Sequence, residues 1–308
     1  MREHDRFTDP LSTRRRRRFD DELDPDSIPA PPHRTTPPVW DTTDADAPPT
    51  GDRWSTWSTV GAARHGPTPR PAWVVTDHAA VDTELGVLKT GKEADVHLLE
   101  RAVPGGDRRS LLAAKRYRTA EHRMFHRDAG YLEGRRVRRS REMRAMARRT
   151  GFGRDLLSGQ WADAEFAALA TLWSDGVAVP YPVQVAGTEL LLEFIGSPDG
   201  TAAPRLAQLR PGPGALHALW DQLTAALHGL ARHGWTHGDL SAYNLLVDGD
   251  RLVLIDLPQV VEVVANPRGP DYLHRDVARV GGWFVARGLS PEAPDVLLAE
   301  LVVALGMV

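Results

Sequence analysis

The order in which strand-like and helix-like patterns follow one another is the feature that most limits how these 308 residues can fold. Strand patterns dominate the first half of the patterned region, and long amphipathic helices dominate the second. Turns at Gly91 and at residues 104–106 separate the first three strands, which predicts an antiparallel meander. The expected strands are residues 85–89, 94–103, 110–117, 181–186, 189–195, 244–247 and 252–257, and the expected helices are residues 161–173, 216–233, 272–287 and 291–305.

This order predicts an α+β, bilobal fold. The first lobe is an antiparallel sheet with one helix, and the second is a short, mainly helical lobe. The pair of prolines at 180 and 182 confines the strand that follows to a sheet edge or a strand start.

The sequence ahead of these patterns has a different composition. Twelve of the 24 prolines lie in residues 1–72, together with an unbroken arginine run at residues 14–18. Such a segment cannot bury enough apolar surface to offset its chain entropy, so we expect residues 1–72 to be disordered. Tryptophans are unusual for a disordered tail, and we expect some of those in and next to it to dock on the folded part: Trp40, Trp54, Trp57 and Trp73.

Composition also excludes several classes of protein. The formal charge is −3, from 38 Lys and Arg against 41 Asp and Glu, so the chain is not a uniformly basic nucleic-acid binder. Cysteine is absent, which excludes disulfides, thiolate metal sites and cysteine nucleophiles. Because no apolar run is long enough to span a bilayer and the polar start lacks a secretory signal, we expect a soluble, cytoplasmic protein without a membrane partner.

One internal segment is strongly basic. Residues 115–154 hold 14 Lys and Arg against four acids, which is a net charge of +10. The apolar face of this stretch is thin, so we expect residues 116–154 to form a mobile insert. Two interpretations stay open, a solvated loop or a segment that binds RNA, a ribosomal partner or another polyanion.

The second half contains a spacing typical of phosphoryl transfer. His237-Gly238-Asp239 is followed by Asn244, which matches the pattern H-x-D-x-x-x-x-N, and Asp256 ends an apolar strand twelve residues later. Asp239 can accept or orient the proton of an attacking hydroxyl. Asn244 and Asp256 offer the oxygen ligands that Mg²⁺ prefers, so they are the predicted metal ligands.

The first half supplies the expected nucleotide contacts. Lys115 is one of only three lysines and lies in an apolar strand, where its ammonium can bind the α- and β-phosphates. Glu165 is its expected partner, with Asp163 as the alternative. Gly91, Lys92 and Val96 belong to the expected phosphate-covering loop, and Glu193 to Ile195 fit a hinge whose backbone binds adenine.

These motifs resemble the RIO family of atypical protein kinases, over residues 73–287. The most specific elements are the Gly-Lys-Glu run at residues 91–93, the loop at residues 237–244, and Ile255-Asp256-Leu257-Pro258-Gln259, where Gln replaces the usual Phe-Gly. No winged helix is visible before residue 73, which indicates the branch of the family without one. On this resemblance the lobes are residues 73–195 and 196–308.

The resemblance implies a two-lobed kinase fold, ATP with Mg²⁺, and autophosphorylation or ATPase activity. It implies that Asp239 is the catalytic base, that Asn244 and Asp256 hold the metal, and that Asp256 can also accept phosphate transiently. Relatives in eukaryotes and archaea assist maturation of the small ribosomal subunit. The protein substrate is not implied.

Two other functions remain open at this point. A small-molecule kinase of the aminoglycoside or choline phosphotransferase type shares the catalytic pattern, and a weakly catalytic nucleotide sensor could bind RNA through the basic insert. Only 52 residues follow Asp256, too few for the activation segment and the peptide-docking region of a conventional protein kinase. The short second lobe therefore favours autophosphorylation or an ATP-driven conformational switch.

Overall fold

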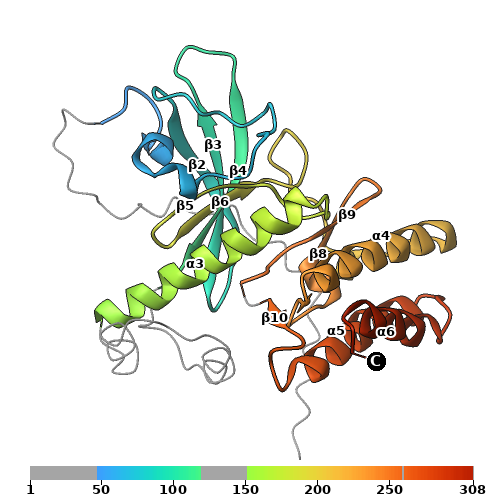
Figure 1. Ribbon diagram of the computed structural model, residues 1–308. Helices are drawn as coiled ribbons and strands as arrows, with labels where there is room; N and C mark the ends of the chain where they lie inside the picture. The colour runs from blue at the N-terminus through green and yellow to red at the C-terminus, as the bar shows by residue number, and fades with distance from the viewer. Residues whose placement is uncertain (1–46, 119–150, 259, 308) are drawn as a thin grey trace, which may run out of the picture. The chain divides into compact units, whose positions relative to one another are not determined.

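The computed structural model in Figure 1 describes residues 47–118, 151–258 and 260–307, with the backbone alone for residues 151–157. All of them belong to one compact unit, Asp41–Val308. No described helix is long and apolar enough to cross a membrane. The basic insert falls almost entirely outside the described residues, as does the arginine run near the start of the chain.

The first lobe is built on one six-stranded antiparallel sheet. Its order is β1-β2-β3-β4-β6-β5, so the predicted meander of β2, β3 and β4 is confirmed and β5 lies at an edge, as its prolines require. The strands are β1 (Arg53–Trp54), β2 (Val81–Thr90), β3 (Ala94–Ala102), β4 (Arg109–Tyr117), β5 (Pro182–Ala186) and β6 (Glu189–Glu193).

The two faces of this sheet are covered by different parts of the chain. Helix α3 (Gly151–Ser174) lies across one face, as Figure 1 shows, and is longer than the predicted helix at residues 161–173. Because side chains alternate along a strand, β4 directs Lys115 and Tyr117 toward α3 and the cavity, and directs Leu112 and Ala114 to the opposite face.

That opposite face is covered by the N-terminal strap, residues 53–75, whose first two residues also pair with β2 at the edge of the sheet. The strap contains β1, a 3₁₀ turn η2 (Thr56–Thr59) and a second one, η3 (Ala62–Arg64). Trp57 packs with Leu99 and Tyr181 in a separate apolar cluster, and the Tyr181 hydroxyl donates a 2.8 Å hydrogen bond to the Pro67 carbonyl.

The predicted disorder of residues 1–72 is therefore wrong for residues 47–72, and residues 1–46 lie outside the described part of the chain. Composition averaged over 72 residues concealed Trp57, whose burial against the sheet offsets the ordering of a proline-rich segment. The expectation that some tryptophans dock on the folded part is confirmed at Trp57, whereas Trp54 stays 41% exposed.

Charged residues close the sheet into a curled shape under the strap. Arg101 is fully buried and binds both carboxylate oxygens of Asp82, at 2.7 and 3.0 Å. Glu189 of β6 accepts hydrogen bonds from Arg53 of β1 (2.6 Å) and Arg116 of β4 (2.7 Å), although β1 and β6 are not neighbours in the sheet. Burial opposes ionisation of Glu189, but the two arginines hold the pKa of its carboxyl below the ordinary value.

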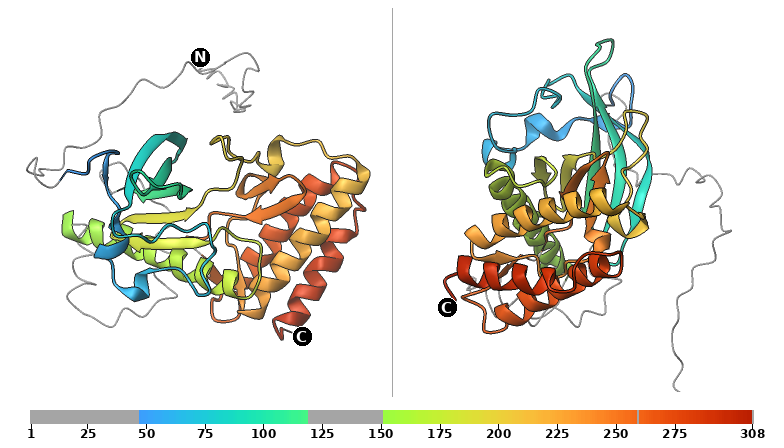
Figure 2. Two further views of the ribbon diagram at one scale, coloured as in Figure 1. Left: turned by 90° about the horizontal axis from the view of Figure 1, so that it is seen from above. Right: turned by 90° about the vertical axis from the view of Figure 1, so that its right-hand side faces the viewer.

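The second lobe is mainly helical, as predicted. Helices α5 and α6 pack on one another and α6 packs on α4, beside the hairpin of β8 and β9 (Figure 2). Its elements are α4 (Pro213–Arg232), α5 (Gly269–Val285), α6 (Ala293–Ala304), the turns η5 (Leu206–Gln208) and η6 (Ala242–Asn244), and the strands β7 (Trp235–Thr236), β8 (Leu245–Asp248), β9 (Arg251–Leu254) and β10 (Val261–Glu262). The α+β, bilobal, protein-kinase-like fold is confirmed.

Candidate active site

One cavity of about 450 Å³ brings together nearly all the predicted site residues. Both lobes line it: the first contributes the β2–β3 turn, β4 and α3, and the second contributes the segments after β6, before η6 and after β9. The predicted residues on its wall are Gly91, Lys92, Val96, Lys115, Glu165, Glu193, Ile195, Asp239 and Asp256. Asn244 is the only predicted site residue that is not on the wall.

Lys115 lies at the centre of the charged part of this cavity. Its ammonium is 2.8 Å from Glu165 of α3 and 2.6 Å from Asp256, so it joins the two lobes. Burial alone would favour a neutral amine, but the carboxylates of Asp256 and Glu165 raise the pKa of Lys115 well above its ordinary value. Lys115 in turn holds the pKa of Asp256 well below the usual range.

Glu165, rather than Asp163, is the partner of Lys115. Glu165 is fully buried and also accepts hydrogen bonds from the Tyr117 hydroxyl and from the Leu257 amide, the latter at 3.0 Å. Asp163 instead pairs with Arg64 of the N-terminal strap. Three donors thus fix one carboxylate, which sets the position of the lysine that it binds.

Asp256 has an unusual backbone conformation. Its φ of 68° makes it the only residue other than glycine with positive φ in the described part of the chain. Such a conformation costs on the order of 1 kcal/mol for a residue with a Cβ and persists where the surrounding structure enforces it. Here the turn after β9 aims the carboxylate at Lys115 and the cavity.

Helix α5 holds the loop that carries Asp239 through hydrogen bonds to the loop backbone. Asp276 is buried, and its carboxylate accepts hydrogen bonds from the Gly238 amide (2.6 Å), the Leu240 amide (2.9 Å) and the Thr236 hydroxyl (2.8 Å). His237 Nε2 donates to the Ile255 carbonyl at 3.1 Å, which ties the loop to the end of β9. The loop geometry therefore depends on a residue that the sequence motifs did not include.

Asp239 reaches the cavity from this loop and is paired with an arginine. Arg279 of α5 lies 2.9 Å from one carboxylate oxygen of Asp239, and both side chains are about half exposed, at 51% and 46%. Arg275, one turn earlier on α5, donates to the Gly238 carbonyl. The predicted catalytic base is thus oriented by an ion pair and remains open to solvent.

Asn244 lies behind the wall, next to Asp239 and Asp256. Its side-chain NH₂ group donates to the backbone carbonyl of Asp239 (2.9 Å), and its backbone carbonyl accepts from the Ile255 amide (3.0 Å). Among the described residues nothing donates to Asn244 Oδ1 or to Asp256 Oδ2. Two unpartnered oxygens on adjacent segments suit Mg²⁺, which binds one or two protein oxygens and takes its other ligands from phosphates and water.

The predicted phosphate-covering loop is a tight turn between β2 and β3. The Gly91 amide donates to the Ala94 carbonyl at 3.0 Å, and a Cβ at position 91 would lie 2.8 Å from that same oxygen, so the turn needs glycine. Arg118 binds the Asp95 carboxylate at 2.6 Å and braces the far side of the turn. The single glycine of this loop is therefore explained by backbone contact.

Residues of the predicted hinge, Glu193 to Ile195, also line the cavity. The Glu193 amide donates to the Tyr181 carbonyl (2.8 Å) and the Ile195 carbonyl accepts from Ala203 (3.0 Å), so these two groups are already used. No described backbone carbonyl accepts from the amides of Phe194 or Ile195. The apolar lining includes Leu88, Val96, Ala113, Leu169, Leu192 and Leu246.

Sequence reasoning missed four charged residues at this site. Lys89 and Arg205 line the cavity, and Asp276 and Arg279 hold the loop of Asp239. Burial lowers the pKa of Lys89, which Asp256 partly offsets. One signal was present in the sequence, because Asp276 falls on the apolar stripe of its helix and a carboxylate there requires partners.

The curled sheet, the helix that supplies Glu165, and a nucleotide-sized cavity with Asp239 and Asp256 at its edge define a protein of the protein-kinase-like class. A family model described as RIO domain matches residues 107–296, more than half of the chain. The chain belongs to the RIO domain family, as the resemblance implied.

Several curated proteins are similar in sequence. The RIO-type serine/threonine-protein kinase Rio1 of Haloferax volcanii is 33% identical over 214 residues, which cover 69% of this chain and 67% of that protein. Serine/threonine-protein kinase rio2 of Schizosaccharomyces pombe is 30% identical, over 67% of this chain and 52% of its own length. Serine/threonine-protein kinase RIO1 of Saccharomyces cerevisiae is 30% identical over 42% of this chain, which is only 27% of that protein.

Among solved structures, the crystal structure of the Rio2 kinase-ADP/Mg²⁺-phosphoaspartate complex from Chaetomium thermophilum is similar with a TM-score of 0.47 and 22% sequence identity. The match covers 73% of this chain and 67% of that one.

Proposed function

We propose that the chain transfers the γ-phosphoryl group of ATP, with Mg²⁺, to a serine or threonine hydroxyl of a protein. The observation that carries the proposal is that Lys115 and Asp256, 141 residues apart in sequence, meet in one cavity with Asp239 on its wall. Membership of the RIO domain family and relatives named serine/threonine-protein kinases support the same chemistry.

Each group has a distinct role in this proposal. Lys115, held by Glu165, binds the α- and β-phosphates, and the amides of Phe194 and Ile195, whose residues line the cavity, are available to adenine. Asn244 and Asp256 would hold Mg²⁺, which supplies charge neutralisation on the phosphate oxygens. Asp239 orients the attacking hydroxyl and accepts its proton.

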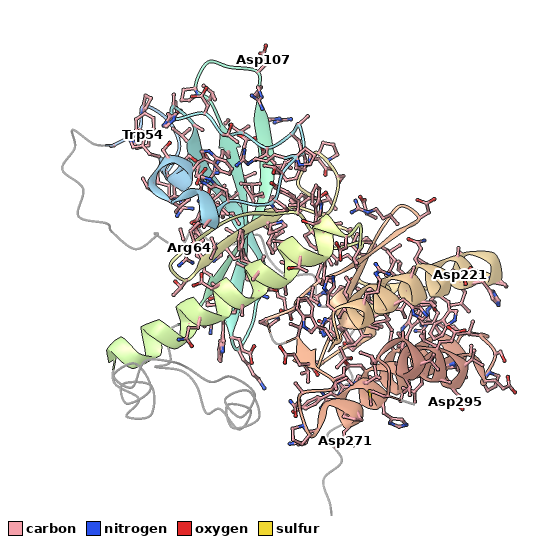
Figure 3. All side chains as sticks on the ribbon, viewed as in Figure 1. Trp54, Arg64, Asp107, Asp221, Asp271 and Asp295 are labelled. Atoms are coloured by element: carbon pink, nitrogen blue, oxygen red, sulfur yellow. The ribbon has the colours of Figure 1, made fainter. Side chains whose placement is uncertain are left out.

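The test is Mg²⁺-dependent ATP turnover by the full chain and two variants. We expect Asp239→Asn and Asp256→Ala each to lower turnover by about 100-fold or more, since each removes a charge that acts on the reacting groups. Asp221→Asn, an exposed acid on α4 labelled in Figure 3, is the matched control and should turn over ATP like the parent. Parent-like turnover in both site variants would refute the assignment.

Asp256 is also proposed as a transient phosphate acceptor. Its Oδ2 faces no described donor, and attack on the γ-phosphorus would form an acyl phosphate while the bond to the bridging oxygen breaks and ADP leaves. Water then releases phosphate and restores the carboxylate. We expect a hydroxylamine-labile label from γ-labelled ATP, whereas a label resistant to hydroxylamine would place the phosphate on a hydroxyl.

The other early interpretations have different outcomes. Small-molecule phosphotransferase activity is not favoured, because the family model and the relatives named above are of the RIO type. An RNA or ribosomal partner for residues 116–154 and a cytoplasmic location remain proposals. They rest on the charge and composition of the sequence alone, and most of that basic segment lies outside the described residues.

A further inference from the structure

A row of basic and aromatic side chains runs along one face of α5 and ends at the catalytic loop. Arg268 immediately precedes the helix, and Tyr272, Arg275 and Arg279 follow at intervals of four, three and four residues. These intervals place all four on one side of a helix. We call these four residues the arginine ridge.

Contacts within the ridge fix its direction. The guanidinium carbons of Arg268 and Arg275 lie 5.5 and 4.7 Å from the ring centre of Tyr272, one from each neighbouring turn. Arg275 also donates to the Gly238 carbonyl, and Arg279 lies 2.9 Å from Asp239. The ridge therefore leads from the start of α5 to the predicted catalytic base.

The ridge is exposed and its charge is only partly compensated. All three arginines are exposed, and a salt bridge within the described residues is found only at Arg279. Asp271, labelled in Figure 3 near the start of α5, is exposed as well, yet no salt bridge joins it to these arginines. Arg275 retains further donors, because one hydrogen bond to a carbonyl uses only one of five N–H groups.

We propose that the arginine ridge docks an acidic polypeptide segment and delivers its hydroxyl group to Asp239. The inference rests on the proposed protein kinase function and names the class of substrate, a serine or threonine with acidic neighbours. A guanidinium recognises a carboxylate through paired hydrogen bonds, so two arginines without a salt bridge, Arg275 beside the loop of Asp239 and Arg268 at the start of α5, select negative charge. The ridge supplies the docking surface that the short second lobe did not reveal in sequence.

The spacing of the ridge predicts where the acidic residues lie. A helix rises 1.5 Å per residue, so Arg275 and Arg268 lie about 6 and 16 Å along the helix axis from Arg279. An extended peptide advances about 3.3 Å per residue. Carboxylates about two and about five residues from the acceptor therefore face Arg275 and Arg268.

The experiment measures phosphorylation of synthetic peptides by the full chain with ATP and Mg²⁺. Each peptide has one central serine, with Glu, Gln or Lys two and five residues from it, on either the N-terminal or the C-terminal side. We expect the Glu peptide of one series to have the lowest KM. Arg268→Gln should raise that KM about threefold, which is within the range of exposed ion pairs. Arg268→Glu should raise it about tenfold, because charge reversal adds repulsion to the lost attraction, and neither should change kcat much.

A matched control and two further readouts keep the test decisive. Arg251→Glu changes an exposed arginine at the start of β9, away from α5, and should leave the KM for the Glu peptide unchanged. ATP hydrolysis without peptide and transfer to any of the peptides are both measured for each protein, because the absence of both in the parent would refute the proposed function itself. Competition by polyuridylate is measured for the parent and Arg268→Glu.

Three results would overturn the inference while leaving ATP chemistry intact. The first is equal KM values for Glu, Gln and Lys peptides. The second is the same change in KM for Arg268→Glu and Arg251→Glu. The third is inhibition by polyuridylate that Arg268→Glu abolishes, together with equal KM values for acidic and neutral peptides. That result would assign the ridge to RNA.

Discussion

Asp276 is the residue whose replacement tests most sharply how the loop that carries Asp239 is positioned. Its carboxylate is buried under that loop, with Oδ2 accepting from the Gly238 amide and the Thr236 hydroxyl and Oδ1 accepting from the Leu240 amide. Asp276→Asn preserves the shape of the side chain and replaces one of the two oxygens with an NH₂ group. The variant therefore changes hydrogen bonding with almost no change in packing.

The magnitude follows from these three bonds. If the amide oxygen of Asn takes the place of Oδ2, the Leu240 amide faces another donor and loses its partner, which costs about 1–3 kcal/mol when buried. The other two bonds lose the assistance of a negative charge, which removes about 0.5–1 kcal/mol from each. We expect the free energy of unfolding to fall by about 2–5 kcal/mol.

The assay combines urea unfolding at pH 7 with ATP turnover by the folded variant. A loop displaced by about 1 Å should lower turnover by about 100-fold, because catalysis depends on near-attack geometry. Asp271→Asn, on the exposed side of the same helix, should lose no more than about 0.5 kcal/mol. A stable, active Asp276→Asn protein would refute the argument that α5 positions Asp239.

Three other predictions concern the lysine, the strap and pH. Lys115→Met leaves Glu165 buried without its cation, so we expect the free energy of unfolding to fall by about 3 kcal/mol and ATP turnover to slow by about 100-fold. Parent-like values of both quantities would contradict the ion-pair account. Gly66→Ala should lower the free energy of unfolding by about 2 kcal/mol or more, because its Cβ would lie 2.0 Å from a backbone oxygen of β5. The control variant Gly61→Ala has open space around its Cβ and should change the free energy of unfolding by less than about 0.5 kcal/mol. The pKa of Asp256 is lower in the folded protein than in the unfolded chain, so its contribution to stability is present above about pH 4 and is lost as the pH falls further. A melting temperature followed from pH 6 to pH 3 should therefore fall more steeply for the parent than for Asp256→Asn, and identical slopes would contradict the shift.

Much of the fold could be predicted because local patterns and tertiary structure agree in most elements. The helix at residues 216–233 has an uninterrupted leucine stripe that becomes the buried face of α4, and the meander follows turns at glycine and proline. The strap could not be predicted in the same way. Its stability comes from contacts of Trp57 with strands far away in sequence, and composition carries no information about such contacts.

The candidate site, too, could be predicted only in part from the sequence. Lys115, Asp239 and Asp256 were found because phosphoryl transfer requires particular residue types at recognisable spacings. Arg279 belongs to no such pattern and is one of 35 arginines, so only the placement of α5 against the loop reveals its pairing with Asp239. The pairing that orients Asp239 was therefore revealed only by tertiary contact, whereas the residues proposed to act on the nucleotide were found from sequence motifs.

The most direct test of the central claim is a crystal structure of the full chain with a non-hydrolysable ATP analogue and Mg²⁺. The account predicts one ion bound by Asn244 Oδ1 and the Asp256 carboxylate at about 2.1 Å, with the Lys115 ammonium on the α- and β-phosphates of the same nucleotide. A nucleotide bound outside the cavity, or an ion that contacts neither Asn244 nor Asp256, would contradict it.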